Sequence, residues 1–258
     1  MSVDKGRVVI EGIGLSKSYG PITALDNVDI EIRAGEITAL VGDNGAGKST
    51  LIKILAGAVA PDAGEVRVNG ETVVLRTPAD ARDLGIETIF QDLALAPDRD
   101  VVTNLFLGRE IVRKGLAGMI GMLDRGAMEA QALTQIDALG VNIPRSTGVS
   151  IGEMSGGQQQ SVAVARGAFW AKTGMFMDEP TAALGVRESS RVLRLARQIA
   201  GSGVAVVLIS HILPHVMELA DRVVVLRHGQ KVAELTEDIS MDRLVTLIVG
   251  VDAHDAVT

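Results

Sequence analysis

The stretch Gly42-Asp43-Asn44-Gly45-Ala46-Gly47-Lys48-Ser49 decides the fold of this chain. Its two outer glycines, followed at once by lysine and serine, have the spacing of a phosphate-binding loop. An apolar run at 37–41 precedes the loop, and the apolar spacing after Ser49 indicates a helix. Because glycines let backbone N–H groups turn inward at the positive end of a helix, the segment can cradle phosphate oxygens. A chance glycine-rich turn is the alternative, and the flanking strand and helix argue against it.

This loop predicts a nucleotide triphosphate site with assigned side chains. Lys48 is expected to reach the β- and γ-phosphates, and the Ser49 hydroxyl is expected to bind Mg²⁺. The residues predicted to contact ATP here are Gly42, Asp43, Asn44, Gly45, Ala46, Gly47, Lys48, Ser49 and Thr50.

A second candidate site lies downstream, where the apolar run 175–177 ends in Asp178 and Glu179. At the carboxyl end of a strand beside a phosphate loop, Asp178 can hold Mg²⁺ through water. Glu179 points in a different direction and can act as the general base for the attacking water. Two ordinary solvated acids at a strand end are the alternative reading.

Composition limits the class of protein. The 258 residues fit one large domain, and the net charge of −7 argues against broad binding to nucleic acid or anionic lipid. The absence of cysteine excludes disulfides and thiolate metal sites. No apolar run is long enough to cross a bilayer, and no apolar signal core follows the opening residues. We therefore expect the isolated chain to be soluble and cytoplasmic.

The order of the predicted elements favours an α/β fold with a largely parallel sheet covered on both faces. Alternating strands, including a hairpin at Asn69-Gly70, form an antiparallel β portion near the N-terminus. Strand-like runs disappear between residues 93 and 160, where 125–139 is helical and 115–126 is expected to be a flexible or interfacial loop. The predicted division is an ATPase core of residues 1–92 and 161–250, an inserted helical lobe of 93–160, and a frayed tail of 251–258.

Met154-Ser155-Gly156-Gly157-Gln158 lies shortly before the acidic pair. A Ser-Gly-Gly-Gln segment between a phosphate loop and an Asp-Glu strand resembles the ATP-binding-cassette (ABC) superfamily of P-loop NTPases. The resemblance extends over the chain to about Gly250, and the motifs are specific when they occur together. It implies an ATPase with ATP and Mg²⁺ as ligands.

Three further residues match motifs of the family, by resemblance. Tyr19 is similar to the aromatic residue that stacks on adenine, although a buried strand tyrosine is the alternative. Gln91 resembles the glutamine that touches Mg²⁺ and the attacking water and couples the site to the membrane partner. His211 resembles the histidine that contacts the γ-phosphate and orients the catalytic glutamate. His211 and His215 also have the spacing of metal ligands on a helix, but Pro214 between them disfavours that reading.

The signature segment has a physical role of its own. Ser155, Gly156, Gly157 and Gln158 stand where a helix begins, which is a second anion-seeking helix end. In the family this end belongs to the opposite subunit, so the resemblance implies a head-to-tail homodimer, or a paired cassette, with ATP clamped between two chains. Two departures are notable. Met154 stands where leucine is common, and Gly185 stands where many members carry aspartate.

The segments 40–51, 179–185 and 209–215 look most like those of bacterial monosaccharide importers of the fructose and ribose type. This implies a peripheral protein on the cytoplasmic face of the membrane, a separate integral sugar permease that docks near residues 91–109, and an extracytoplasmic sugar-binding protein. No nucleic-acid partner is expected. The alternatives are a soluble cassette ATPase that acts on DNA or ribosomes, and a scaffold that binds ATP without turnover. The chain lacks the long coiled coil or zinc module that is typical of the first alternative. It also retains Glu179 and His211, one of which the second alternative would lack.

Overall fold

The computed structural model describes residues 5–115, 119–139, 149–182 and 184–250. The expected tail 251–258 and Ala183 lie outside these ranges. The strands are β1 Val8–Tyr19, β2 Ile22–Arg33, β3 Ile37–Val41, β4 Ala63–Val68, β5 Glu71–Val73, β6 Ile86–Ile89, β7 Gly174–Asp178, β8 Ala205–Ile209, β9 Arg222–Arg227 and β10 Gln230–Leu235. The helices are α1 Lys48–Leu55, α2 Pro78–Asp83, α3 Val101–Leu105, α5 Arg125–Leu139, the short 3₁₀ turn η1 Ile151–Glu153, α6 Gly156–Trp170, α7 Val186–Gly201, α8 Leu213–Leu219 and α9 Met241–Val249.

Two sheets form the framework, as the sequence predicts. A four-stranded antiparallel sheet has the order β2-β1-β4-β5, and its β4–β5 hairpin turns at Asn69-Gly70. A six-stranded sheet has the order β10-β9-β3-β8-β7-β6, in which only the edge pair β9–β10 is antiparallel. The chain is therefore an α/β protein with a mixed sheet and an antiparallel portion near its N-terminus.

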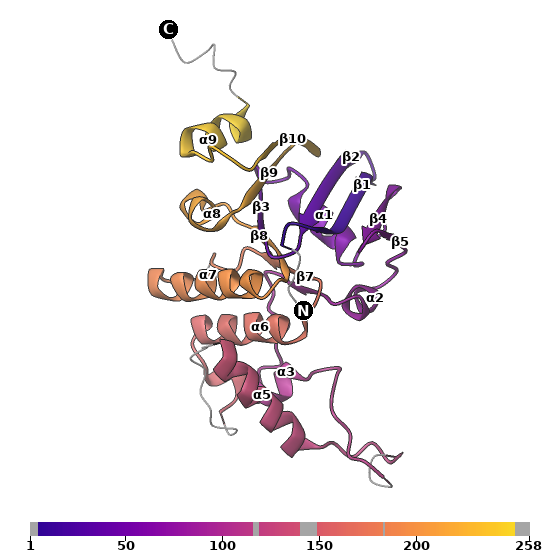
Figure 1. The fold of residues 1–258 in the computed structure, drawn as a ribbon, viewed down its shortest axis with the longest axis vertical. Coiled ribbons are helices and arrows are strands. Elements are labelled where there is room, and N and C mark those ends of the chain that lie inside the picture. The colour runs from indigo at the N-terminus through magenta and orange to yellow at the C-terminus, as the bar shows by residue number, and fades with distance from the viewer. Residues whose placement is uncertain (1–4, 116–118, 140–148, 183, 251–258) are drawn as a thin grey trace.

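The central strands β7 and β8 are apolar on both faces because each face meets a different layer. Phe176 and Val207 pack into the core that β1, β2 and α1 share, whereas Met177 and Leu208 pack against α6 and α7. Figure 1 shows α6 and α7 side by side along one side of the strands, with α1 and the antiparallel sheet on the other. This layering holds the ends of the central strands rigidly.

A separate apolar cluster joins α3, α5 and α6 at one end of the molecule. Phe106, Phe169 and Trp170 meet edge to face in its interior. The predicted helix at 125–139 is confirmed as α5. The predicted boundary between residues 160 and 161 falls inside the continuous helix α6, so this helix belongs to the lobe and the core at once. The division into core and lobe stays an interpretation.

The segment 115–126 differs from the expected loop where the structure describes it. Arg113 donates its N–H to Met122 O at 2.8 Å, and Asp124 donates to Ile111 O at 2.7 Å. Helix α5 then begins at Arg125. Arg125 and Gly126 therefore belong to α5 and not to the expected flexible or interfacial loop, whereas residues 122–124 stay outside regular elements and are held by backbone pairing.

Candidate active site

The register of the six-stranded sheet gathers the predicted site at one edge. Leu40 and Asp178 both pair with Ile209, and Ile89 pairs with Met177. Strands β3, β8, β7 and β6 are parallel, so their carboxyl ends lie together. The phosphate loop, the acidic pair and the segments that carry Gln91 and His211 follow these four ends. Ligands of open α/β sheets bind at such an edge.

The phosphate loop is closed by Lys48 and by close backbone packing. Lys48 Nζ donates to Gly42 O at 2.7 Å and to Asp43 O at 2.8 Å. Gly42 and Gly47 have φ of 144° and 102°, and a Cβ on either would lie 2.1 Å from Leu226 O or 2.4 Å from Ala24 O. Both glycines are therefore required for the shape of the loop.

The loop forms one wall of a cleft of about 360 Å³. Of the residues predicted to bind nucleotide or catalyse, those that line it are Tyr19, Asn44, Gly45, Gly47, Lys48, Ser49, Thr50, Gln91, Asp178 and Glu179. Gly42, Asp43 and Ala46 do not line it. The Ala46 N–H is bound to Asp43 O at 3.1 Å, and its side chain is buried. Ile22 and Ala24 line the cleft beside Tyr19, and the sequence analysis missed both because they lie in an ordinary strand.

The groups around the loop include both a cation and carboxylates, so the loop can bind an anionic ligand together with a metal cation. Burial lowers the pKa of Lys48, although Glu179, Asp178 and Asp43 oppose the shift. Burial raises the pKa of Asp178, and the hydrogen bond from the Ser49 hydroxyl and the charge of Lys48 oppose that shift. Ser49 and Asp178 thus present a hydroxyl and a half-buried carboxylate side by side. Oxygen donors of this kind suit Mg²⁺, so the residues fit the expected ion.

Glu179 has an unusual backbone that separates it from Asp178. Its φ of 52° lies in the left-handed region, and its N–H donates to Ile209 O at 3.1 Å. Its side chain is largely buried, and Oε2 lies 2.7 Å from His211 Nδ1, a close polar contact that lacks hydrogen-bond alignment. The His211 side chain is 64% exposed. The structure therefore brings these two predicted residues together, with the histidine on the solvent side.

Tyr19 and Gln91 both line the cleft and are both exposed. Tyr19 ends β1 and is 46% exposed, so the alternative of a buried strand tyrosine is wrong. Gln91 follows β6 and is exposed. An exposed aromatic ring on the cleft wall can stack on a base.

The signature segment lies elsewhere in this chain. Ser155 caps α6 by accepting from Gln158 N at 3.4 Å, and Gln158 Oε1 accepts from Ser155 N at 2.9 Å. Together with Gly157, these residues line a separate cavity of about 480 Å³ between α6 and α7. Within the described residues, no part of the signature segment lines the cleft with Lys48 and Glu179.

Other singled-out residues have local roles. His215 places Nδ1 3.3 Å from Thr181 Oγ1, directly after the acidic pair. Met154, which departs from leucine, is buried in the cluster of α3, α5 and α6. Gly185, which departs from aspartate, begins α7 without a side-chain cap.

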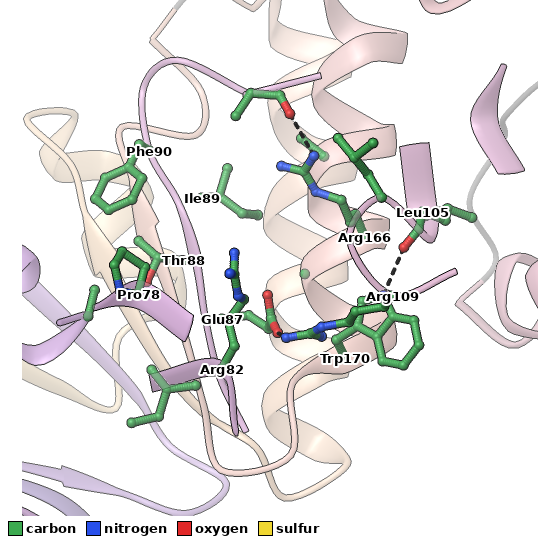
Figure 2. A pocket seen from close by; sticks show the side chains of 17 residues that line it. Pro78, Arg82, Glu87, Thr88, Ile89, Phe90, Leu105, Arg109, Arg166 and Trp170 are labelled. Carbon is green, nitrogen blue, oxygen red and sulfur yellow. Dashed lines mark hydrogen bonds and ion pairs between the residues drawn. The ribbon is translucent and has the colours of Figure 1, made fainter. Parts of the chain in front are cut away.

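A groove of about 300 Å³ opens where α2, β6 and the lobe meet, and Figure 2 shows its walls. Arg109 forms an ion pair with Glu87 at 2.6 Å and covers the ring of Trp170 at 4.8 Å. Burial raises the pKa of Glu87, and Arg109 opposes that shift. On the same groove Arg166 donates to Leu93 O at 2.8 Å and to Ala94 O at 2.7 Å. These residues were not predicted from the sequence, because no local pattern marks a pair that forms between distant segments.

None of the helices in the described ranges combines the length and apolar character that a membrane span needs.

Comparison with known proteins agrees with this geometry. The family model described as ABC transporter matches residues 25–182. The chain is 46% identical to the fructose import ATP-binding protein FrcA of Rhizobium meliloti over 244 residues, which cover 94% of each protein. It is 45% identical to the xylose/arabinose import ATP-binding protein XylG of Sulfolobus acidocaldarius, with 83% of this chain and 82% of that protein covered. It is 42% identical to the ribose import ATP-binding protein RbsA 1 of Rubrobacter xylanophilus, over 95% of this chain and 47% of that protein.

Solved structures share the fold. A nucleotide-free ATP-binding cassette from an ABC transporter superposes with a TM-score of 0.79 at 24% identity, covering 96% of this chain and 97% of the other. The dimeric cassette MJ0796 bound to ADP and phosphate superposes with a TM-score of 0.73 at 24% identity, covering 90% and 100%.

Proposed function

This chain belongs to the ABC transporter family, and on that premise we propose that it is the ATP-hydrolysing subunit of an importer that takes up a monosaccharide. Two relatives that match this chain over more than four fifths of both lengths are named as fructose and xylose/arabinose import ATP-binding proteins. The observation that carries the proposal is the cleft in which Lys48, Ser49, Asp178 and Glu179 meet. The identity of the sugar is left to the permease and binding protein, which make the sugar contacts.

In the proposed reaction, water attacks the γ-phosphorus of ATP and the products are ADP and phosphate. Tyr19 stacks on the adenine, and Lys48 with the loop N–H groups binds the β- and γ-phosphates. Ser49, Asp178 and Gln91 would hold Mg²⁺, which supplies charge neutralisation at the phosphates when bound. Glu179 accepts a proton from the attacking water, and His211 keeps the Glu179 carboxylate in position.

The catalytic assembly is proposed to be a head-to-tail homodimer. The phosphate loop donates to ATP from one side only, and the signature segment faces a separate cavity in the same chain. A partner chain can bring its Ser155–Gly157 helix end to the open side of the nucleotide. A paired cassette from a related chain would serve in the same way.

The groove in Figure 2 is the proposed docking surface for the permease. It lies between the sheet and the lobe, and Arg166 on its wall holds the segment that follows Gln91. A cytoplasmic segment of the permease seated here could therefore move Gln91 against the cleft. In this proposal the subunit lies at the cytoplasmic face of the membrane. An extracytoplasmic sugar-binding protein delivers the sugar to the permease from the opposite side.

Steady-state hydrolysis tests the enzyme. Glu179→Gln is expected to lower turnover by about 10²–10⁴-fold, because a positioned general base contributes that much. The same variant should still retain MgATP and dimerise by light scattering, whereas Lys48→Ala should lose nucleotide retention. Unchanged turnover in Glu179→Gln would contradict the assigned base, and a monomer under saturating MgATP would contradict the dimer.

Copurification with an integral membrane protein separates the importer from a soluble ATPase. A tagged chain expressed with its neighbouring permease gene should be recovered with the permease. A single substitution at the groove, Arg109→Glu, should reduce that recovery while leaving hydrolysis by the isolated chain intact. Recovery with ribosomes or DNA in place of a membrane protein would favour the soluble alternative.

A further inference from the structure

Glu188 lies between two glycines that belong to different parts of the site. It is the third residue of α7, and its side chain folds back toward Gly185 at the start of that helix. A Cβ on Gly185 would lie 2.7 Å from Glu188 Oε2. A Cβ on Gly157 would lie 2.6 Å from Glu188 Cγ and 3.2 Å from Glu188 Cβ. The side chain therefore fills the space that side chains at both glycines would need.

The backbone conformation at neither position requires a glycine. Gly185 has φ −69° and ψ 167°, which any residue adopts and which suits a capping aspartate. Gly157 is inside the first turn of α6 and is not among the residues with positive φ. Helix rules alone would therefore favour alanine at 157 and aspartate at 185. The contact with Glu188 Cγ opposes a side chain at position 157, and a side chain at position 185 requires the Glu188 carboxylate to move.

The carboxylate of Glu188 has no other task in the folded chain. Within the described ranges it makes no hydrogen bond or ion pair, and it lines the cavity of the signature segment with Ser155 and Gln158. Its stem packs against α6, so its position is tied to Gly157 at one end and to the start of α7 at the other. The start of α7 follows the segment that leaves Glu179.

We propose that Glu188 is a positioning residue that holds the signature segment Ser155–Gly157 at a fixed place relative to the chain that follows Glu179. This inference rests on the proposed dimer, in which the signature segment serves the partner's ATP and Glu179 serves its own. Glu188 then connects, within one chain, elements of two ATP sites. Its loss should lower kcat, because the signature segment is misplaced in the closed dimer, with little effect on binding of ATP to the phosphate loop.

A double-substitution cycle on Gly157 tests the proposal. Gly157→Ala pushes a methyl group against Glu188 Cγ, and a displacement of about 1 Å at a site can cost on the order of 10²-fold in kcat. Glu188→Ala alone should cost less, about tenfold, with KM for ATP unchanged. The double variant should recover most of the way to the level of Glu188→Ala, because Glu188 Cγ at 2.6 Å is removed and only Cβ at 3.2 Å remains. Equal losses from Gly157→Ala in both backgrounds would overturn the proposal.

The carboxylate end has its own test. Gly185→Asp places a second carboxylate against Glu188 and should lower kcat, and Glu188→Ala in the same chain should restore part of it. If the kcat losses of Gly185→Asp and Glu188→Ala multiply in the double variant, the two side chains do not occupy the same space and the proposal is contradicted. Glu218→Ala, which removes an exposed charge from α8, is the matched control and should leave kcat unchanged.

Thermal unfolding of every variant separates misfolding from misplacement. Wild-type hydrolysis and nucleotide-driven dimerisation of Glu179→Gln are measured in parallel. If wild-type hydrolysis and dimerisation of Glu179→Gln both fail, the proposed function is wrong. If both hold and the kcat losses in the two cycles simply multiply, only the role of Glu188 is wrong.

Discussion

Glu179, the proposed general base, has a strained backbone conformation. Its left-handed φ of 52° is unfavourable for a glutamate, yet the bond from its N–H to Ile209 O holds it there. The turn directs its carboxylate to His211, while Asp178 stays with Ser49. Two adjacent carboxylates can therefore take different roles.

The raised pKa of Asp178 leads to a prediction about stability. A carboxyl group with a raised pKa binds its proton more tightly in the folded state, so its contribution to the stability of the nucleotide-free protein falls as pH rises through that pKa. Asp178→Asn should remove this dependence and raise the melting temperature of the nucleotide-free protein at neutral pH. At the same time it should lose the stabilisation by MgATP, which for the wild type is about 2.7 kcal/mol at 100 times Kd. Scanning fluorimetry across pH, with and without MgATP, measures both effects, and a lower melting temperature for the nucleotide-free variant would contradict the prediction.

Tyr19 should contribute to binding and not to the chemical step. Loss of a stacked aromatic costs about 1–3 kcal/mol, so Tyr19→Ala should raise KM for ATP roughly 5–150-fold with kcat nearly unchanged. Tyr19→Phe keeps the ring and is the control that should stay close to wild type. A fall in kcat at unchanged KM would place the residue in another role.

Helix α6 connects the parts of the site more than any other element. Ser155 caps its start, Arg166 holds the segment after Gln91 from its middle, and Trp170 at its end donates to Leu105 O at 2.8 Å. A shift of this one helix moves the signature segment and the segment beside Gln91 together. The helix can thus relay the state of the groove to the ATP cleft.

Arg166→Ala should therefore affect both stability and turnover. The half-buried carbonyl of Leu93 and the exposed carbonyl of Ala94 lose a charged donor, and a hydrogen bond to a charged group contributes about 1.5–3 kcal/mol to the free energy of unfolding. Urea unfolding measures the loss, and the ATPase rate should fall because the segment after Gln91 is released. Arg166→Lys keeps the charge but cannot reach both carbonyls in the same planar geometry, so an intermediate result is expected. A fully stable and active alanine variant would show that the two bonds are dispensable.

In the proposed dimer, each chain contributes two halves of an ATP site that lie on separate cavities, and the partner chain completes each half. The cleft with Lys48 and Glu179 is one half, and the cavity beside Ser155 is the other. A head-to-tail pair of chains makes two complete sites from these halves. The arrangement predicts complementation between inactive chains.

Lys48→Ala and Ser155→Ala chains should each be inactive alone but active when mixed. Half of the randomly formed dimers contain both chains, and each of these has one intact site, so up to about a quarter of wild-type turnover should return. Mixing Lys48→Ala with Glu179→Gln should restore nothing, because both residues belong to the same half of the site. Recovery in that control, or none in the first mixture, would refute the head-to-tail arrangement.

The local features of this protein can be predicted from its residues alone. The phosphate loop, the acidic strand end, the Asn69-Gly70 hairpin and the capped start of α6 are readable because each is made by residues close together in the chain. Steric and hydrogen-bonding rules act over a few residues there. For this reason most residues that line the cleft with Lys48 had been singled out from the sequence.

How these features meet follows from the packing of the folded chain. The strand register that places Asp178 beside Ile209, the reach of Arg166 to Leu93, and the wedge of Glu188 against Gly157 join residues far apart in the chain. Such contacts depend on the packing of whole layers, and no periodicity or spacing encodes them locally. The groove, and the separation of the signature segment from the cleft, follow from that packing.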